Sequence, residues 1–205
     1  MKSLYPSIKI INESNSEDTA VMKKALNSKT NFIDIGHAGT AMRFLASYFA
    51  SKLNSEITLT GSDRMKNRPI GILVDALRDL GAEIEYEEKQ GYPPLRIIGK
   101  NLIGNEVSLP ANISSQFISS LMMLGVKIDN GIKLNLEGNI TSKPYILMTK
   151  KLIDKIGCKV VINNNEIEIW WIIFSLEFIF IKWYYYQTGH ERSSYKNFNI
   201  YVQIT

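Results

Sequence analysis

Short apolar runs alternate with longer amphipathic stretches along most of the chain. Short runs rich in Ile, Leu, Val and Thr predict strands, whereas apolar positions three and four residues apart predict helices. Pro69 suits the first turn of a helix, and Gly81 suits the position after its last turn. The expected strands are 32–35, 57–59, 84–86, 95–98, 107–109, 133–136, 159–162 and 166–169, and the expected helices are 17–26, 40–50, 69–80, 115–124 and 144–156.

The same order of elements occurs twice, as strand, helix, strand, helix, strand, strand. Three marks recur after 75 to 77 residues: the helix openings at Gly39 and Ser114, the strand ends at Gly61 and Gly138, and the helix ends at Gly81 and Gly157. Such self-similarity predicts an α/β fold of repeated βαβαββ units. Residues 1–31 are read as the end of an earlier unit, so the sequence is expected to begin inside one.

The helix openings of both units are small and polar, in the segments HAGT at 37–40 and NISSQ at 112–116. A helix beginning offers free N–H groups and the positive end of a dipole, so these segments suit a phosphate or a carboxylate. Plain helix capping is the competing interpretation. His37 is read either as a ligand contact or, more often for such a residue, as a capping or packing residue.

Two further loops carry polar groups at equivalent positions of the repeat. The loop 61–69 contains Arg64, Lys66 and Arg68, and the loop 138–145 contains hydroxyls, a lysine and a tyrosine. Arginine clamps carboxylates and phosphates with two hydrogen bonds. Four such loops are expected to meet at one edge of the domain, which favours an anion site over a solvated surface. We find no catalytic triad, metal-ligand spacing or P-loop in the sequence.

Composition excludes several classes of protein. The net charge of +4 is mild, and no basic tract interleaved with aromatics occurs, so nucleic-acid binding is not expected. The single cysteine, Cys158, is read as a core residue and fits a reducing, cytoplasmic compartment. Neither a signal peptide nor a run of about 20 apolar residues is apparent, so no membrane association is expected.

The composition changes near residue 170. Twelve of the 21 aromatic residues lie in the last 36 positions, where neither a helical nor an alternating period is found. The tail is either an aromatic segment that packs on the core or a partner, or a frame-shifted translation of an AT-rich gene, which we favour. Residues 1–169 are therefore expected to form one domain, and 170–205 a frame-shifted or irregular tail.

Five segments occur in order between about residues 4 and 169: HAGTAMRF at 37–44, LTGSDRMKNRPIGILVDALRDLGA at 59–82, GYPPLRI at 91–97, LPANISSQFISSL at 109–121 and SKPYILMT at 142–149. Together they resemble the successive motifs of the EPSP synthases, a family of carboxyvinyl transferases. That resemblance implies an inverse α/β barrel domain of βαβαββ units, as in the enolpyruvyl transferases. It also implies transfer of the enolpyruvyl group from phosphoenolpyruvate to shikimate 3-phosphate, without a metal or an organic cofactor, by a cytoplasmic and usually monomeric enzyme.

The resemblance assigns roles to particular residues. Shikimate 3-phosphate is expected to contact Ser114, Ser115, Gln116, Ser142 and Tyr145, and phosphoenolpyruvate to contact Gly39, Arg64 and Gln116. No catalytic residue is expected in this chain, because the family's catalytic Asp, Glu and Lys belong to a second domain.

The chain departs from the family pattern in several places. Members commonly have Asn where this chain has His37, and Pro where it has Phe44. The family's Lys-Ser and Asn-Arg motif is also absent. The chain is therefore expected to be an incomplete, poorly active or inactive N-terminal-half fragment. Two alternatives stay open: a non-catalytic anion-binding fragment or pseudogene product, and a transferase acting on UDP-N-acetylglucosamine, which the segments 114–116 and 142–145 disfavour.

Overall fold

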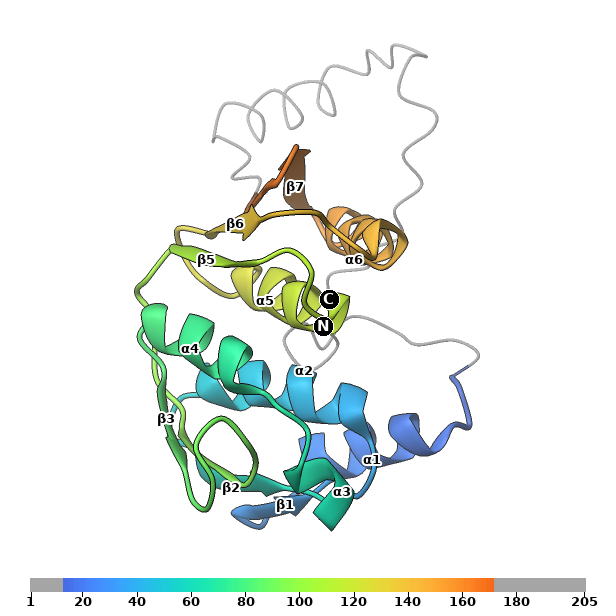
Figure 1. The fold of residues 1–205 in the computed structure, drawn as a ribbon, viewed down its shortest axis with the longest axis vertical. Helices are drawn as coiled ribbons and strands as arrows, with labels where there is room; N and C mark the ends of the chain where they lie inside the picture. Colours follow the sequence, from blue (N-terminus) through green and yellow to red (C-terminus); the bar gives the residue numbers. More distant parts are fainter. Residues whose placement is uncertain (1–12, 172–205) are drawn as a thin grey trace, which may run out of the picture.

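The computed structural model describes residues 13–171 of the chain, which form two similar α/β units (Figure 1). A first helix, α1 (Glu17–Leu26), precedes them. The first unit comprises β1 (Phe32–Asp34), α2 (Gly39–Ala50), β2 (Glu56–Thr60), α3 (Asp63–Lys66), α4 (Gly71–Asp79), β3 (Glu83–Tyr86) and β4 (Leu95–Ile98). The second comprises β5 (Glu106–Pro110), α5 (Ser115–Gly125), β6 (Ile132–Glu137), α6 (Lys143–Lys155), β7 (Cys158–Asn163) and β8 (Glu166–Trp171).

Each unit contains one four-stranded sheet of the same topology. The strand orders are β1-β2-β4-β3 and β5-β6-β8-β7, with the first pair parallel and the other pairs antiparallel. Equivalent backbone bonds extend the two parallel pairs: Ile35 N–H donates to Thr60 O at 3.0 Å, and Ala111 N–H donates to Glu137 O at 2.8 Å. The two donor residues are 76 positions apart along the chain and the two acceptor residues are 77 apart, so the predicted sequence repeat is also a structural repeat.

Local sequence accounts for the helix limits. The hydroxyl oxygens of Ser16, Ser62 and Ser114 accept hydrogen bonds from backbone N–H groups at the beginnings of α1, α3 and α5. Gly81 and Gly157 follow α4 and α6 with φ of 95° and 91°, a conformation that favours glycine.

Helices α2 and α5 pack against each other in parallel and in register. At their beginnings the Gln116 amide contacts Thr40, and beyond their ends the Lys127 ammonium donates to the Ser51 carbonyl. Between these points the Ser120 hydroxyl bonds to Ser47 Oγ at 2.7 Å. Small side chains therefore let the two helices approach where the units meet, and Figure 1 shows the helices side by side at this junction.

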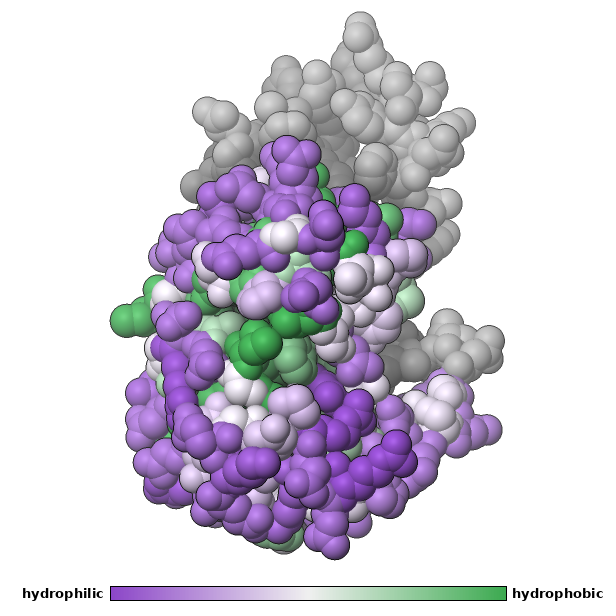
Figure 2. All heavy atoms as spheres, viewed as in Figure 1, coloured by the Kyte–Doolittle hydropathy of each residue, from purple (hydrophilic) through white to green (hydrophobic). Residues whose placement is uncertain are grey.

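The hydrophobic core is continuous across the two units. Leucine and isoleucine side chains of both sheets face α2, α4 and α5, and most are less than 5% exposed. On the face drawn in Figure 2, hydrophobic residues gather in a band between the two units, while charged and polar residues cover both ends. The two units thus form one folded body.

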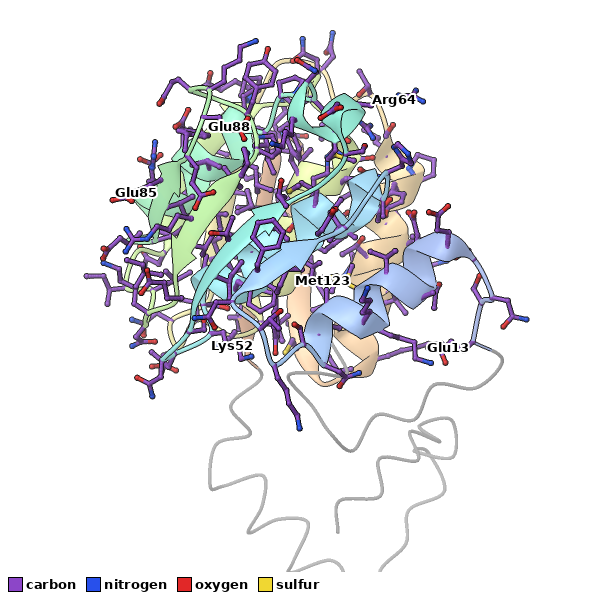
Figure 3. All side chains as sticks on the ribbon, turned by 90° about the horizontal axis from the view of Figure 1, so that it is seen from below. Glu13, Lys52, Arg64, Glu85, Glu88 and Met123 are labelled. Carbon is purple, nitrogen blue, oxygen red and sulfur yellow. The ribbon has the colours of Figure 1, made fainter. Side chains whose placement is uncertain are left out.

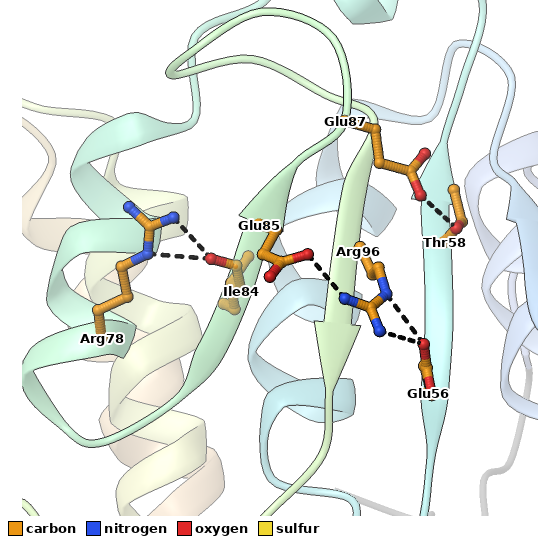
Figure 4. Close-up of polar contacts among 7 residues, drawn as sticks. All are labelled: Glu56, Thr58, Arg78, Ile84, Glu85, Glu87 and Arg96. Atoms are coloured by element: carbon orange, nitrogen blue, oxygen red, sulfur yellow. Dashed lines mark hydrogen bonds and ion pairs between the residues drawn. The ribbon is translucent and has the colours of Figure 1, made fainter.

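The outer face of the first sheet is polar. Arg96 on β4 pairs with Glu85 on β3 at 2.7 Å and with Glu56 on β2 at 2.6 Å (Figure 4). Arg78 on α4 donates to the carbonyl of Ile84. The two exposed Arg96 pairs join β4 to β2 and β3, and the Arg78 bonds join α4 to β3, so we regard these contacts as structural.

The structure differs from the sequence expectations in three places, apart from small shifts of other element ends. Helix α4 begins at Gly71, so Pro69 precedes the helix rather than forming its first turn, because Ile70 at the N-cap has a non-helical φ of −133°. The loop after β2 contains the short helix α3, which the expectation of a single polar loop missed, because Ser62 caps a turn too short for a helical period. Strand β8 also continues to Trp171, beyond the expected boundary at 169, because its backbone pairs with Cys158 and Lys159. The remainder of the tail, 172–205, lies outside the described residues. Within residues 13–171, no helix is long and apolar enough to span a membrane.

Candidate functional site

The parallel strands place four helix beginnings on one side of the molecule. Strands β1 and β2 lead into α2 and α3, and strands β5 and β6 lead into α5 and α6. Since parallel strands end at the same edge of a sheet, the two helices that follow them begin at that edge. The parallel contact between α2 and α5 then brings the edges of both units together.

Gln116 joins the beginnings of α2 and α5. Its side-chain nitrogen donates to the hydroxyl of Thr40 at 3.1 Å, across the junction between the units. Ser114 is the N-cap of α5, and its hydroxyl accepts from the Gln116 N–H at 3.4 Å. Ser115 is the first residue of α5 and is half-buried. Of the predicted contacts, Ser114, Ser115, Gln116 and Gly39 are therefore brought to one place.

Two arginines lie against Gly39, the first residue of α2. A Cβ at this position would collide with Arg68 Nη1 and would lie 2.6 Å from Arg43 Nη1. Arg43 donates to the Gly39 carbonyl at 2.6 Å and its guanidinium lies 5.6 Å from the centre of the Phe117 ring. The absence of a side chain at Gly39 is thus what lets both guanidinium groups approach the helix beginning.

Arg43 is an unusual residue for the buried face of a helix. It is only 6% exposed, and its Nε has no hydrogen-bond partner among the described residues. Burial, and then the positive charge of Arg68, lower the pKa of Arg43 to about 10. Arg43 takes part in none of the ion pairs found among the described residues, so it has no carboxylate partner there. An uncompensated cation in this position favours a bound anion as its partner.

The remaining predicted contacts are Arg64 on α3, and Ser142 and Tyr145 at the beginning of α6. Arg64 is exposed on α3, and Figure 3 shows its side chain at the periphery. Ser142 is the N-cap residue of α6, without a capping bond from its hydroxyl, and is half-buried. Burial raises the pKa of the half-buried Tyr145. The Thr149 hydroxyl donates to Ser119 Oγ at 2.8 Å, which fixes α6 against α5 one turn beyond Tyr145.

Sequence reasoning did not single out Arg43 or Arg68. Arg43 lies within GTAMRFLASYFA, where a charged residue on an otherwise apolar, buried face was the available signal. Arg64 and Arg68 are both exposed residues of the segment after β2, and spacing alone could not tell which of the two guanidinium groups lies against Gly39. Arg64 lies on the short helix α3, whereas Arg68 lies two residues after its end.

An apolar hollow lies away from these residues. It measures about 260 Å³ and is lined by the later turns of α1, α2 and α5, including Leu26, Tyr48, Ser51 and Met123. We place the candidate site at the helix beginnings instead, because the polar and charged groups converge there. Within the described part of the chain, no group of three or more His, Cys, Asp or Glu could hold a metal ion.

Comparison with known proteins identifies the family of the chain. Residues 2–170 match the family model of EPSP synthase (3-phosphoshikimate 1-carboxyvinyltransferase). The chain belongs to the EPSP synthase family. A 3-phosphoshikimate 1-carboxyvinyltransferase of Bacteroides fragilis is 51% identical over 146 residues, which cover 71% of this chain and 35% of that protein. One of Erwinia tasmaniensis is 47% identical over 132 residues, covering 64% and 30%.

Solved EPSP synthases share the fold. One structure from Acinetobacter baumannii matches with a TM-score of 0.68 at 18% identity, covering 82% of this chain and 44% of that one. Another matches with a TM-score of 0.65 at 20% identity, covering 76% and 39%. The expected α/β architecture of this family is therefore confirmed. The chain spans about a third of the length of the curated relatives it matches.

Proposed function

We propose that this chain provides the shikimate 3-phosphate half-site for enolpyruvyl transfer from phosphoenolpyruvate. The observation that carries the proposal is the pair of guanidinium groups, Arg43 and Arg68, held at Gly39 beside the beginning of α5. Two cations, free helix N–H groups and several hydroxyls suit a ligand pair that carries two phosphates and two carboxylates.

We assign the phosphate of shikimate 3-phosphate to Ser114, Ser115 and Gln116, with Ser142 and Tyr145 as further contacts. Phosphoenolpyruvate would lie at Gly39, within reach of Gln116. We transfer the clamping role from Arg64 to Arg68, because the guanidinium of Arg68 lies against Gly39 while Arg64 lies at the periphery. Arg64 stays a candidate, and the two arginines can be compared directly.

The proposed reaction makes clear what these residues do. The 5-hydroxyl oxygen of shikimate 3-phosphate attacks C2 of the enol and gives its proton to a base, while an acid adds a proton to the methylene carbon. The intermediate then loses a proton from the new methyl group as the bond from C2 to the phosphate oxygen breaks and inorganic phosphate leaves. The cations of this chain hold two anionic substrates together and stabilise the departing phosphate. We assign the acid and base to a second domain, which would close over the site and exclude water.

We further propose that the binding domain expected at 1–169 extends to the end of β8 at Trp171, with the residues after it as a separate tail. We expect a cytoplasmic, monomeric protein that binds no nucleic acid and no membrane.

Two alternative functions predict different results in binding and activity measurements. A purely anion-binding fragment would bind shikimate 3-phosphate without releasing phosphate from the substrate pair, and a UDP-sugar transferase would bind UDP-N-acetylglucosamine in preference.

Calorimetric titration with shikimate 3-phosphate tests the proposal. Ser115→Ala should weaken binding by about fivefold or more, because one hydroxyl donor to the phosphate is lost. Ser108→Ala, at an exposed position of β5, is the matched control and should bind as the unaltered chain does. Equal affinity of both variants, or preference for UDP-N-acetylglucosamine, would contradict the assignment.

A further inference from the structure

We propose that His37 is an additional anion-binding residue of this site, which makes its affinity depend on pH. The inference rests on the proposed anion site at Gly39 and adds a titratable cation to it. The ligand class is a small, doubly charged oxyanion such as the phosphate group of the substrates.

His37 is held by the loop that leads towards Arg68. Its Nδ1 lies 2.8 Å from the Ser62 hydroxyl, and the Ser62 N–H donates to the Gly36 carbonyl at 3.0 Å. Gly61 packs so closely on the same carbonyl that a Cβ would lie 2.7 Å from it. These contacts join the loop before Gly39 to the loop before α3 and hold the exposed imidazole at the Ser62 hydroxyl.

The neighbouring arginines favour a bound anion next to His37. Arg43 is 6% exposed with an unpartnered Nε, and its Nη1 reaches the carbonyl of Gly39, two residues after His37. Arg68 lies against the same glycine from the other loop. The beginning of α2, the Arg43 and Arg68 guanidinium groups and His37 therefore form one electropositive cluster, here called the electropositive corner.

The bond to Ser62 persists in both protonation states of the ring. A neutral imidazole accepts the Ser62 hydroxyl proton at Nδ1, whereas the imidazolium donates to the hydroxyl oxygen. In either state Nε2 is left for a ligand or for water. Protonation thus changes the charge of the corner without changing its geometry, so the effect on anion affinity is electrostatic.

The surrounding charges make a bound anion and a proton on His37 favour each other. Arg43 on α2, Arg64 and Lys66 on α3, and Arg68 after it supply positive charge, while Asp34 after β1 and Asp63 on α3 oppose it. The Asp34 carboxylate accepts from the Gly36 N–H at 2.8 Å, and Lys66 is paired with Glu88. With Glu88 included, four cations are set against three carboxylates, and this excess of positive charge favours a bound dianion. A bound dianion and a positive charge on His37 would attract each other in the same way.

Sulfate binding as a function of pH tests this inference, because sulfate, unlike phosphate, stays fully ionised across the range in which histidine titrates. Affinity should be about three- to tenfold higher near pH 5.5 than near pH 8.5. His37→Asn should remove this difference and lower the affinity near pH 5.5 towards that near pH 8.5. His190→Asn, which alters the only other histidine and lies outside the described residues, should retain it.

The outcomes separate the two proposals. If the chain binds no sulfate, or if Arg68→Gln does not weaken binding at any pH, the anion site itself is wrong and His37 has no role in it. If sulfate binds through Arg68 with the same affinity at both pH values, or if His37→Asn keeps the pH dependence, only the role of His37 is overturned.

Discussion

The side-chain amide of Gln116 donates a 3.1 Å hydrogen bond to the hydroxyl of Thr40, and so joins the beginnings of two helices from different repeats. Gln116→Ala removes this link together with a proposed ligand donor. We expect binding of shikimate 3-phosphate to weaken by about fivefold or more, since one hydrogen bond is worth about 1 kcal/mol. Thr40→Val should have a smaller effect, because it removes the link and leaves the amide free to meet the ligand. Titration calorimetry of the two variants compares them, and equal losses would refute a direct role for Gln116.

Arg68 should matter more than Arg64 for anion binding. Arg68→Gln removes a guanidinium that lies against Gly39, and we expect about 10- to 100-fold weaker binding of phosphoenolpyruvate or sulfate, the range for hydrogen bonds to a charged group. Arg64→Gln makes the same change of charge at the periphery and serves as the control. A larger loss in Arg64→Gln would return the clamping role to that residue.

Gly39→Ala should impair the site without unfolding the protein. The added methyl group would displace the Arg68 guanidinium and crowd Arg43, so both donors would move from their present positions. We expect phosphoenolpyruvate affinity to fall by about tenfold or more, with a loss of stability of about 1–3 kcal/mol at most, the usual range for overpacking. Gly71→Ala is the matched control, because Gly71 also opens a helix and a Cβ there meets its nearest neighbour at an ordinary 3.4 Å. Unchanged binding in Gly39→Ala would show that the guanidinium pair is not the anion site.

Replacing Arg43 should separate stability from binding. Arg43→Met removes a buried cation that lacks a carboxylate partner, so we expect the free energy of unfolding in denaturant to rise by about 1 kcal/mol or more. Sulfate affinity should fall at the same time. Arg78→Met should instead destabilise the protein, because Arg78 donates two hydrogen bonds to the Ile84 carbonyl. A destabilised Arg43→Met protein would mean that Arg43 contributes to folding rather than to ligand binding.

Tyr145 should contribute to the alkaline limit of stability. Burial raises its pKa in the folded state, so the folded protein keeps the phenol proton at pH values where the unfolded chain loses it. The corresponding stability is present below the ordinary tyrosine value of about 10 and is lost as pH rises through the raised folded value. Tyr145→Phe should therefore lose less stability than the unaltered chain between about pH 9 and pH 11, as measured by denaturant unfolding. Parallel pH curves for both proteins would exclude this contribution.

Much of the fold could be predicted because the elements are marked locally. Helix α1 was expected at 17–26 and has those limits, since Ser16 caps it and its charges follow the helix dipole. Strand β8 was placed two residues too short, because its end depends on pairing with Cys158 rather than on its own sequence. Helix α3 is similarly too short for periodicity to reveal it.

The candidate site could be predicted only in part. The polar helix openings are visible as motifs, and their convergence follows from the repeat. The direction of a long side chain does not follow from the repeat. Arg64 and Arg68 are four residues apart, yet it is the Arg68 guanidinium that lies against Gly39. Arg43 is a similar case, because its burial depends on packing between α2 and α5 that no local pattern specifies.

The in-register pairing of α2 with α5 also has a consequence for how such a protein could arise. These helices occupy equivalent positions in the two units, so an ancestral single unit could have formed a similar pair by associating with a second copy of itself. Gene duplication and fusion then free each copy to specialise. One helix opening here carries Gly39 with its arginines, and the other carries Ser114, Ser115 and Gln116, so the two halves of the site differ in chemistry while keeping a common geometry.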